Sequence, residues 1–343
     1  MNDRCFLGLV IALLPGLKPL DRIKLLQTFD REEDFVVQFR NDIEEVLKHQ
    51  LKLFWDIDEI CARAGQIDAI CRKRLIEWVS WKDSDYPPLL REMYDPPAVI
   101  FYRGQLPNPV KPLLGMVGTR KPSPEASAQA FLIACGIGQA GVSVVSGLAL
   151  GIDAMSHRGN IAGGVPGYAV LGSGADEIYP CVNRPLAKRI LDSGGSLLSE
   201  YPPGTHPDKW NFPARNRIIS ALSRSVLIVE APQKSGALHT AAFAMDQGRD
   251  LWIASAGIQQ HHGALYDKRG TVKLAYDGAD IIYNADDILK KWNIDIAENN
   301  EYKIPVGSSG SCAESTGKKE QLSNGMLTRE LAASMAKYLE IDL

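Results

Sequence analysis

Short apolar runs alternate with longer amphipathic segments through the middle of the chain. The apolar runs lie at residues 113–117, 142–145, 168–171, 196–198, 225–229 and 251–254. The segments between them repeat apolar residues at helical spacing, near residues 124–140, 185–191, 214–222 and 237–247. A short run that is apolar throughout is typical of a strand covered on both faces. Strands that alternate with helices in this way predict an α/β fold with a doubly wound parallel sheet.

The stretch from Leu113 to His157 shows how one unit of this fold is built. After the first apolar run, Ser123 can cap the next helix, Pro124 suits its first position and Glu125 complements its dipole. The second run, residues 142–145, must be parallel to the first because a helix joins the two strands. Both strand-to-helix turns therefore lie at the carboxyl edge of the sheet, where doubly wound folds bind ligands.

The first of these turns has the chemistry of an anion site. It reads Gly118-Thr119-Arg120-Lys121, so backbone amides at a helix start lie beside two cations, which suits a phosphate group. The dinucleotide fingerprint is absent, because it needs G-x-G-x-x-G here and an acid where Ser146 stands. A P-loop is absent as well. The sequence thus indicates a phosphate-bearing ligand other than NAD or a P-loop nucleotide, and no cofactor is expected.

The chain divides by composition into four parts. Residues 1–79 contain only helical patterns, and residues 80–110 form a turn-rich linker with an edge strand at residues 99–102. The parallel-sheet domain extends over residues 111–295. Residues 296–343, which include a segment rich in Ser, Gly and Lys, are expected to form a flexible tail with one possible helix.

The helical part leaves two interpretations open. The segment Leu14-Pro15-Gly16-Leu17-Lys18-Pro19 breaks two apolar helices, as in a helix-hairpin-helix or sterile-alpha-motif-like module. Such a hairpin can present its turn to a DNA backbone. The alternative is a small helical bundle that docks on the main domain. The second is favoured, because only Lys18 is basic in the turn.

Charge and cysteine content limit the partners and the compartment. The formal net charge is −3, so a polyanion must be bound by a local basic patch. The six cysteines show no C-x-x-C and no clustering with histidine, which disfavours disulfides and zinc and fits a reducing cytoplasm. The pair His261-His262 is a poor metal site, because adjacent residues on a regular element point apart.

The apolar run from Phe6 to Leu14 has the hydrophobicity of a signal-peptide core, but its context does not fit one. Asp3 stands beside Arg4, no small-x-small cleavage site follows, and Pro15-Gly16 ends the run. No stretch approaches the roughly 18 apolar residues that a membrane span needs. A cytoplasmic protein without a membrane partner is expected.

Several strand ends carry turns of the same chemical kind as the first one. Small residues with amides or hydroxyls at a helix start occur at Ser146-Gly147, Gly172-Ser173-Gly174, Phe212–Arg217 and Ser235–Thr240. The guanidinium groups of Arg120, Arg215 and Arg217 suit bidentate phosphate contacts. Alternatively, the last two of these arginines form salt bridges with Glu200 or Glu230.

Two further pairs of residues admit a functional and a structural interpretation. Asp153 and His157 lie four residues apart and suggest acid–base chemistry. Such a pair is more often a carboxylate at a helix start with a packed histidine. Phe212 and Trp210 can stack on the bases of a single strand, and core packing is the alternative for both.

Specific motifs follow one another along most of the chain, roughly from residue 5 to residue 290. They are Asp85–Leu90, Gly118–Arg120, Val145–Ala149, Gly151–Asp153, Tyr179-Pro180, Ser199–Gly204, Phe212–Ile219 and Ser235–Ala241. In content and order this set resembles the DNA-processing protein A family (DprA, also called Smf). The resemblance implies an extended Rossmann-like domain, preceded by a small all-α module, that binds single-stranded DNA. It also implies a homodimer that helps to load the RecA recombinase during natural transformation.

The resemblance assigns roles to individual residues. By motif, Arg120 is a phosphate-binding arginine, and residues from the other turns line the same pocket. Turns and resemblance together predict a DNA-binding site made of Gly118, Thr119, Arg120, Lys121, Ser146, Gly147, Phe212, Arg215, Asn216, Arg217, Ser235, Gly236 and Thr240. No catalytic residue and no metal ligand is expected.

The chain departs from the family pattern at several positions. Leu150 stands where family members usually carry a basic residue, Ala256 stands where a Pro-Gly pair usually begins, and Val272 replaces an Asn. The usual C-terminal winged helix is missing or reduced to the tail. These departures bear on how tightly the protein binds DNA.

Two functions are in competition. The first is a binding protein that holds single-stranded DNA by its phosphates without reading sequence. The second is a nucleotide phosphoribohydrolase of the LOG type, since related folds include such enzymes. Those enzymes carry Pro-Gly-Gly-x-Gly-Thr and a nearby catalytic glutamate, whereas this chain has Ser235-Gly236-Ala237-Leu238-His239-Thr240 with no acid in that role. A binding protein rather than an enzyme is therefore predicted.

Overall fold

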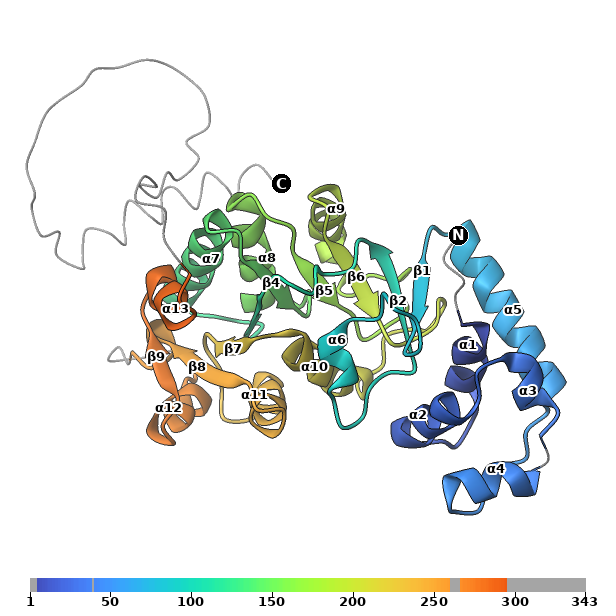
Figure 1. Ribbon diagram of the computed structural model, residues 1–343. Helices are drawn as coiled ribbons and strands as arrows, with labels where there is room; N and C mark the ends of the chain where they lie inside the picture. Colours follow the sequence, from blue (N-terminus) through green and yellow to red (C-terminus); the bar gives the residue numbers. More distant parts are fainter. Residues whose placement is uncertain (1–4, 39, 260–265, 295–343) are drawn as a thin grey trace, which may run out of the picture.

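A computed structural model describes residues 5–38, 40–259 and 266–294. Within these residues the strands form one nine-stranded sheet in the order β1-β2-β6-β5-β4-β3-β7-β8-β9 (Figure 1). The strands β3 to β9 are parallel, whereas β2 pairs antiparallel with both β1 and β6. The strands are β1 (Glu77–Ser80), β2 (Val99–Gly104), β3 (Leu113–Val117), β4 (Ser143–Ser146), β5 (Tyr168–Val170), β6 (Ser196–Ser199), β7 (Ser225–Ile228), β8 (Asp250–Ala254) and β9 (Asp280–Ile282).

Helices cover both faces of this sheet. On one face lie α7 (Pro124–Gln139), α8 (Ile152–Ala162), α9 (Arg184–Asp192) and α13 (Ala285–Lys291); on the other lie α6 (Pro88–Arg91), α10 (Asn211–Leu222), α11 (Ala237–Asp246) and α12 (Arg269–Tyr276) (Figure 1). In β3, Leu114 and Met116 belong to the core under α7, and Leu113 and Val117 belong to the core under α10. Because both faces are buried, the strand reads as a continuous apolar run. The doubly wound parallel sheet is confirmed.

The predicted strands correspond to β3 through β8, and two further strands have no clear sequence signal. β9 has three residues, too few to show a period. β1 follows a long helix with a gap of three residues, and Trp78 lies seven residues after the buried Cys71, so it continues the helical spacing of that helix. Because β1 pairs with β2, residues 99–102 lie one strand in from the edge instead of at the edge as expected.

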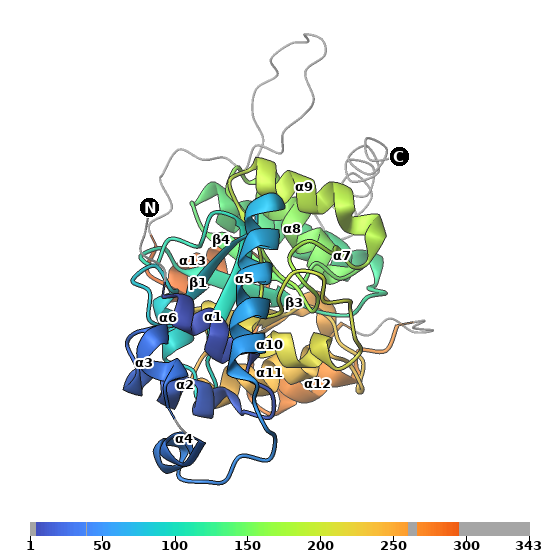
Figure 2. The same ribbon diagram turned by 90° about the vertical axis from the view of Figure 1, so that its right-hand side faces the viewer.

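The helical module consists of α1 (Phe6–Leu13), α2 (Pro19–Thr28), α3 (Glu32–Val36), α4 (Arg40–Leu47) and α5 (Ile57–Lys73). Figure 2 shows it in front of the β1–β2 end of the sheet, with α5 running along its outer side. Leu9 and Phe35 of the module share one hydrophobic core with Trp78 of β1 and Phe101 of β2. The module is therefore packed onto the sheet, which agrees with the docking interpretation of the hairpin.

The first apolar run has a structural role in this module. In α1, Leu7, Leu9 and Ile11 are buried in the module's core. Among the residues that the structure describes, no helix is long and apolar enough to cross a membrane. The pair His261-His262 and the expected tail from residue 296 lie outside the described residues.

Candidate functional site

The order in which the chain adds strands to the sheet changes direction between β3 and β7, while the strands stay parallel. The connection from β3 leads to β4 on one side, and β7 pairs with β3 on the other, so a crevice opens at their carboxyl ends. A cleft of about 1020 Å³ lies there. Most of the predicted binding residues line it, namely Gly118, Thr119, Arg120, Lys121, Phe212, Arg215, Asn216, Ser235, Gly236 and Thr240. Gly147 lines a smaller cavity beside it, with a volume of about 50 Å³.

The turn after β3 is locked to its neighbours by its backbone. The Thr119 amide donates to the Glu230 carbonyl at 2.7 Å, and the Ile152 amide donates to the Thr119 carbonyl at 3.2 Å. A Cβ at Gly118 would lie 2.6 Å from Ile152 Cγ1, so only glycine allows this approach. The side chains of Arg120 and Lys121 are left exposed at the opening of the cleft.

An aromatic pair stands beside the first turn. The rings of Phe212 and Tyr179 have centroids 5.4 Å apart at an interplanar angle of 37°. The Arg120 guanidinium lies 5.8 Å from the Phe212 centroid, within range of a cation–π contact. Tyr179 is 47% exposed, so part of this pair faces solvent. Core packing is thus not the whole role of Phe212. Tyr179, which the sequence analysis named in a family motif but not among the binding residues, also lines the cleft.

Arg215 forms the floor of the site. Its Nη1 donates to the carbonyl of Gly147, directly after β4, and to that of Val170, the last residue of β5. Its Nε donates to Asn216 Oδ1 at 2.9 Å. Burial lowers the pKa of Arg215 to about 10, with a further decrease from Arg120, while Asp153 raises it. The group therefore stays cationic at neutral pH. It braces two strand ends and supplies positive charge beneath the cleft instead of reaching out to a ligand.

Asp153 and His157 have separate structural roles. Asp153 Oδ2 accepts from the amides of Gly147 at 3.1 Å and Ala149 at 3.4 Å, as a carboxylate at the start of α8. Burial raises the pKa of Asp153, and the nearby Arg215 opposes the shift. The His157 ring is fully buried, and its nitrogens have no hydrogen-bond partner among the described residues. Burial lowers its pKa to about 3, so it is neutral at neutral pH. This geometry favours a packed histidine over an acid–base pair.

Two of the predicted binding residues line neither the cleft nor the smaller cavity. Arg217 donates from Nη2 to Glu200 Oε2 at 2.6 Å, and its Nε lies 3.0 Å from Asp95 Oδ2. This is the salt-bridge alternative, realised for one of the two arginines. Ser146 is buried, and its hydroxyl donates to the Met116 carbonyl at 2.5 Å across β3 and β4.

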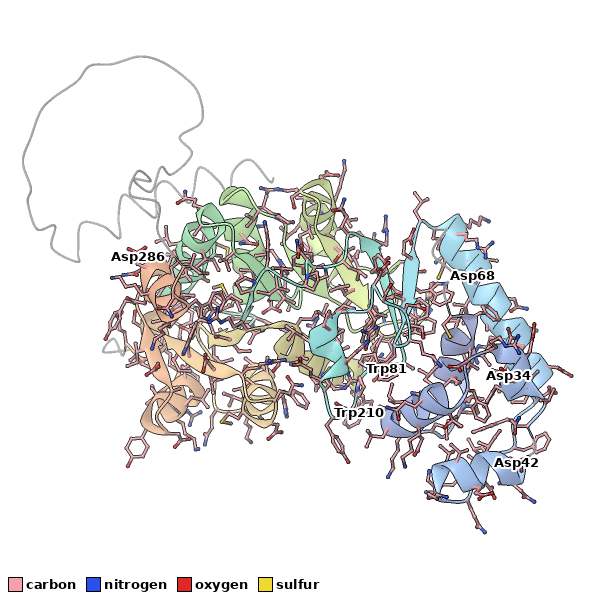
Figure 3. All side chains as sticks on the ribbon, viewed as in Figure 1. Asp34, Asp42, Asp68, Trp81, Trp210 and Asp286 are labelled. Carbon is pink, nitrogen blue, oxygen red and sulfur yellow. The ribbon has the colours of Figure 1, made fainter. Side chains whose placement is uncertain are left out.

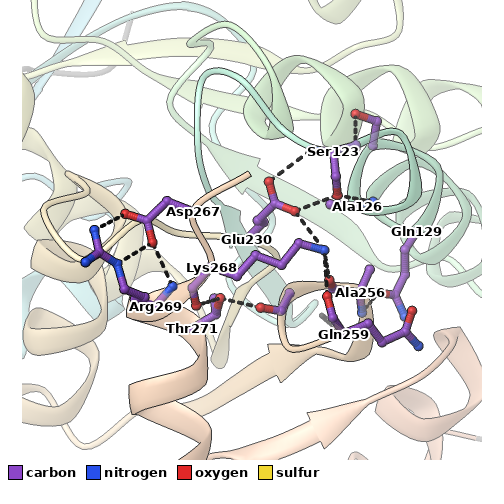
Figure 4. A network of polar contacts seen from close by, with 12 residues as sticks. Ser123, Ala126, Gln129, Glu230, Ala256, Gln259, Asp267, Lys268, Arg269 and Thr271 are labelled. Carbon is purple, nitrogen blue, oxygen red and sulfur yellow. Dashed lines mark hydrogen bonds and ion pairs between the residues drawn. The ribbon is translucent and has the colours of Figure 1, made fainter. Parts of the chain in front are cut away.

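A buried polar network joins the cleft floor to the start of α7 (Figure 4). Glu230, which follows β7, accepts from the Ser123 amide at 2.9 Å and from the Ser123 hydroxyl at 2.6 Å. Lys268 Nζ lies 3.4 Å from Glu230 Oε2 and donates to the carbonyls of Ala256 and Gln259. Hydrogen bonds from Arg269 lower the pKa of the half-buried Asp267 at the cleft margin. The acidic groups of this region are thus already paired.

Three cations dominate the open part of the cleft. Arg120, Lys121 and Lys209 all line it, their side chains are exposed, and none forms an ion pair within the described part of the chain. Because the carboxylates in the lining are buried or paired, the field at the opening is positive even though the net charge is −3. The arrangement suits a polyanion that also offers planar rings to Tyr179 and Phe212.

Comparison with known proteins agrees with this geometry. Residues 77–293 match the profile of the family described as DNA recombination-mediator protein A. The chain belongs to this family. Its sequence is 36% identical to the DNA processing protein DprA of Bacillus subtilis over 255 residues, which cover 73% of this chain and 83% of that protein. It is 43% identical to protein Smf of Synechocystis over 213 residues, 60% of this chain but only 52% of the Synechocystis protein.

Two solved structures of DprA proteins share the fold. The X-ray structure of the Streptococcus pneumoniae protein has a TM-score of 0.64 and 31% identity, and the match covers 83% of this chain and 95% of that one. A Helicobacter pylori structure that concerns the single-stranded DNA binding mode of DprA has a TM-score of 0.54 and 26% identity. That match covers 63% of this chain and 96% of the other.

The departures from the DprA pattern lie at different depths. Leu150 is 42% exposed and lines the small cavity with Arg120 and Tyr179, so it is not a core residue. Ala256 is buried in a short 3-10 helix, and its carbonyl accepts from Lys268. Val272 is half-buried on α12. Of the three, Leu150 is the one that faces the candidate binding site.

Proposed function

We propose that this protein binds single-stranded DNA along the carboxyl edge of its sheet. Arg120, Lys121 and Lys209 neutralise backbone phosphates, and Tyr179 and Phe212 offer ring surface to the bases. The observation that carries the proposal is that one cleft holds a partly exposed aromatic pair and three cations with no ion pair to any described residue. Cationic grooves with aromatic platforms bind single strands with little sequence preference.

The family membership supports the same assignment. DprA of Helicobacter pylori is described by its single-stranded DNA binding mode, and its fold covers 63% of this chain. Within the proposed site, the buried residues Arg215 and Asp153 keep the turns in place, while the exposed cations contact the strand. Arg217 and Ser146 support the fold around the site and do not contact DNA in this proposal.

The resemblance to DprA also supports a proposal about the compartment, the oligomeric state and the protein partner. We infer that the protein acts in the cytoplasm as a homodimer and helps to load the RecA recombinase on the bound strand during natural transformation. A protein that grips the phosphates of single strands without reading their sequence suits such a role, because it can engage any incoming strand.

Direct binding tests the proposal. The purified protein is titrated into a fluorescent oligothymidine and, separately, into a duplex of equal length at the same salt concentration. We expect tighter binding of the single strand, because its bases are free to meet Tyr179 and Phe212. Equal affinity for both, or no binding of either, would contradict the proposal. Incubation with adenosine monophosphate tests the phosphoribohydrolase alternative, for which release of adenine is the positive result.

A further inference from the structure

Trp210 is the tryptophan that the protein presents to solvent. The sequence has six tryptophans, all within the described residues. Trp78, Trp252 and Trp292 are each less than 5% exposed, and Trp55 and Trp81 are half-buried, whereas Trp210 is 73% exposed. Figure 3 shows Trp210 at the periphery of the main domain near α10. A single exposed apolar side chain needs no explanation by itself, so its surroundings decide what it means.

The backbone holds Trp210 on the element that builds the cleft. Its amide donates to Asp208 Oδ1 at 2.8 Å, and its carbonyl accepts from the Ala214 amide at 3.4 Å. It is thus the residue that precedes α10, the helix that brings Phe212 and Arg215 to the cleft. An aromatic ring on a fixed backbone loses little entropy when a flat partner stacks on it.

Lys209 connects the ring to the cleft. Its side chain lines the cleft, and its ammonium lies 5.1 Å from the centroid of the Trp210 ring. A phosphate bound at Lys209 therefore brings the adjoining nucleotide next to the indole. The distance between a phosphate and its own base is short, so a strand that passes Lys209 can place a base on Trp210.

We propose that Trp210 is a stacking platform for a nucleotide that lies outside the cleft, so that the single-strand site extends past Lys209 over the start of α10. The inference deepens the proposed function and rests on it. Arg120, Lys121 and the Tyr179–Phe212 pair bind the part of the strand inside the cleft. The indole stacks on a base from the part of the strand that extends beyond the cleft.

The first test compares substitutions at Trp210 on an oligothymidine of about 20 nucleotides. Base–aromatic stacking is worth about 1–3 kcal/mol per base, so Trp210→Ala should weaken binding at least about fivefold. Trp210→Phe keeps a ring and should recover most of the affinity. Phe54→Ala is the matched control, because Phe54 is 82% exposed but lies in the helical module, and its loss should leave affinity unchanged. Wild-type affinity in Trp210→Ala would overturn the inference.

The second test asks whether a base is the partner. The same proteins are titrated with strands in which one nucleotide at a time is abasic. At the position that meets the indole, removing the base should weaken binding by the wild-type protein about fivefold. The same removal should not weaken binding by the Trp210→Ala variant any further. If Trp210→Ala weakens binding by the same factor whichever nucleotide is abasic, the ring does not meet a base and the inference is wrong. It also falls if Trp210→Ala changes the oligomeric state in sedimentation, because the ring is then a subunit contact. Wild-type protein that binds no strand would instead refute the proposed function.

Discussion

At the scale of single residues, two arginines close in sequence have opposite surroundings. Arg215 lies beneath the cleft, while Arg217 pairs with Glu200 and Asp95 away from it. Both are on α10, and residues two apart on a helix are about 200° apart around its axis, so they cannot face the same pocket. The sequence analysis grouped them as one motif. The sequence predicted this helix near residues 214–222, and α10 begins three residues earlier, at Asn211. Separating the roles of the two arginines also requires the direction of each side chain.

Leu150 provides a test of the cleft boundary at this scale. Because it is 42% exposed beside Arg120 and Tyr179, a cation there should meet a phosphate without being buried. Leu150→Arg is expected to tighten oligothymidine binding and to steepen the dependence of log K on log salt by about 0.7. The melting temperature should stay close to that of the wild type. A folded variant with wild-type affinity and salt dependence would show that Leu150 does not face DNA.

The buried His157 predicts a dependence of stability on pH. Its pKa is lowered to about 3 in the folded protein, against about 6.5 in an unfolded chain. Between these values the unfolded state binds a proton that the native state does not, so this group lowers stability as pH falls below about 6.5. At pH 5 the loss is of the order of 2 kcal/mol. His157→Gln removes the titration, so its melting temperature should fall less than the wild type's between pH 7.5 and pH 5. Parallel pH profiles would contradict this.

At the scale of elements, the site depends on how β3, α7 and β7 meet. The parallel sheet and the shared edge of the strands' carboxyl ends could be predicted, because both follow from the alternation of apolar runs and helices. The network of Ser123, Glu230 and Lys268 could not be predicted, because Ser123 lies more than 100 residues before the other two and the three share no local pattern. Lys209 and Tyr179 were not among the predicted binding residues for a related reason, since they lie on loops whose path is set by tertiary contacts.

The role of this network can be measured through Lys268. Lys268→Met leaves Glu230 buried without its cationic partner, and breaking a buried pair costs about 3–5 kcal/mol. The bonds from Ser123 soften the loss, so we expect a value near the lower end, measured by denaturant unfolding. Lys273→Met is the control on the same segment, because Lys273 pairs with Asp277 at the surface and its loss should change stability little. Equal effects of the two substitutions would show that the network is not structurally important.

At the scale of the whole molecule, β2 belongs to two hydrophobic cores. Val99 and Phe101 pack with the helical module, while Ile100 and Tyr102 pack with the main domain, as alternation along a strand requires. The sequence analysis favoured a helical bundle that docks on the main domain. The strand through which it docks was harder to predict, because β1 is short and its antiparallel pairing to β2 leaves no distinctive period.

The shared strand predicts that the module and the sheet unfold together. Phe101 is 1% exposed, and Phe101→Ala should destabilise the protein by about 3–5 kcal/mol. Tryptophan fluorescence and far-UV circular dichroism should follow a single denaturant transition at the same lowered midpoint. Two separated transitions, with the main domain as stable as in the wild type, would show that the module is an independent unit.

The most direct test of the whole account is the salt dependence of single-strand binding with the cleft cations removed. Arg120, Lys121 and Lys209 are replaced together by alanine, and a control protein carries alanine at Lys24, Lys52 and Lys73, three exposed lysines of the helical module and its linkers. Both variants lose the same formal charge. If the three cleft cations each neutralise a phosphate, the slope of log K against log salt becomes shallower by about 2 in the cleft variant and stays unchanged in the control. Unchanged slope and affinity in a folded cleft variant, or an equal loss in the control, would contradict the assignment of the cleft as the DNA-binding site.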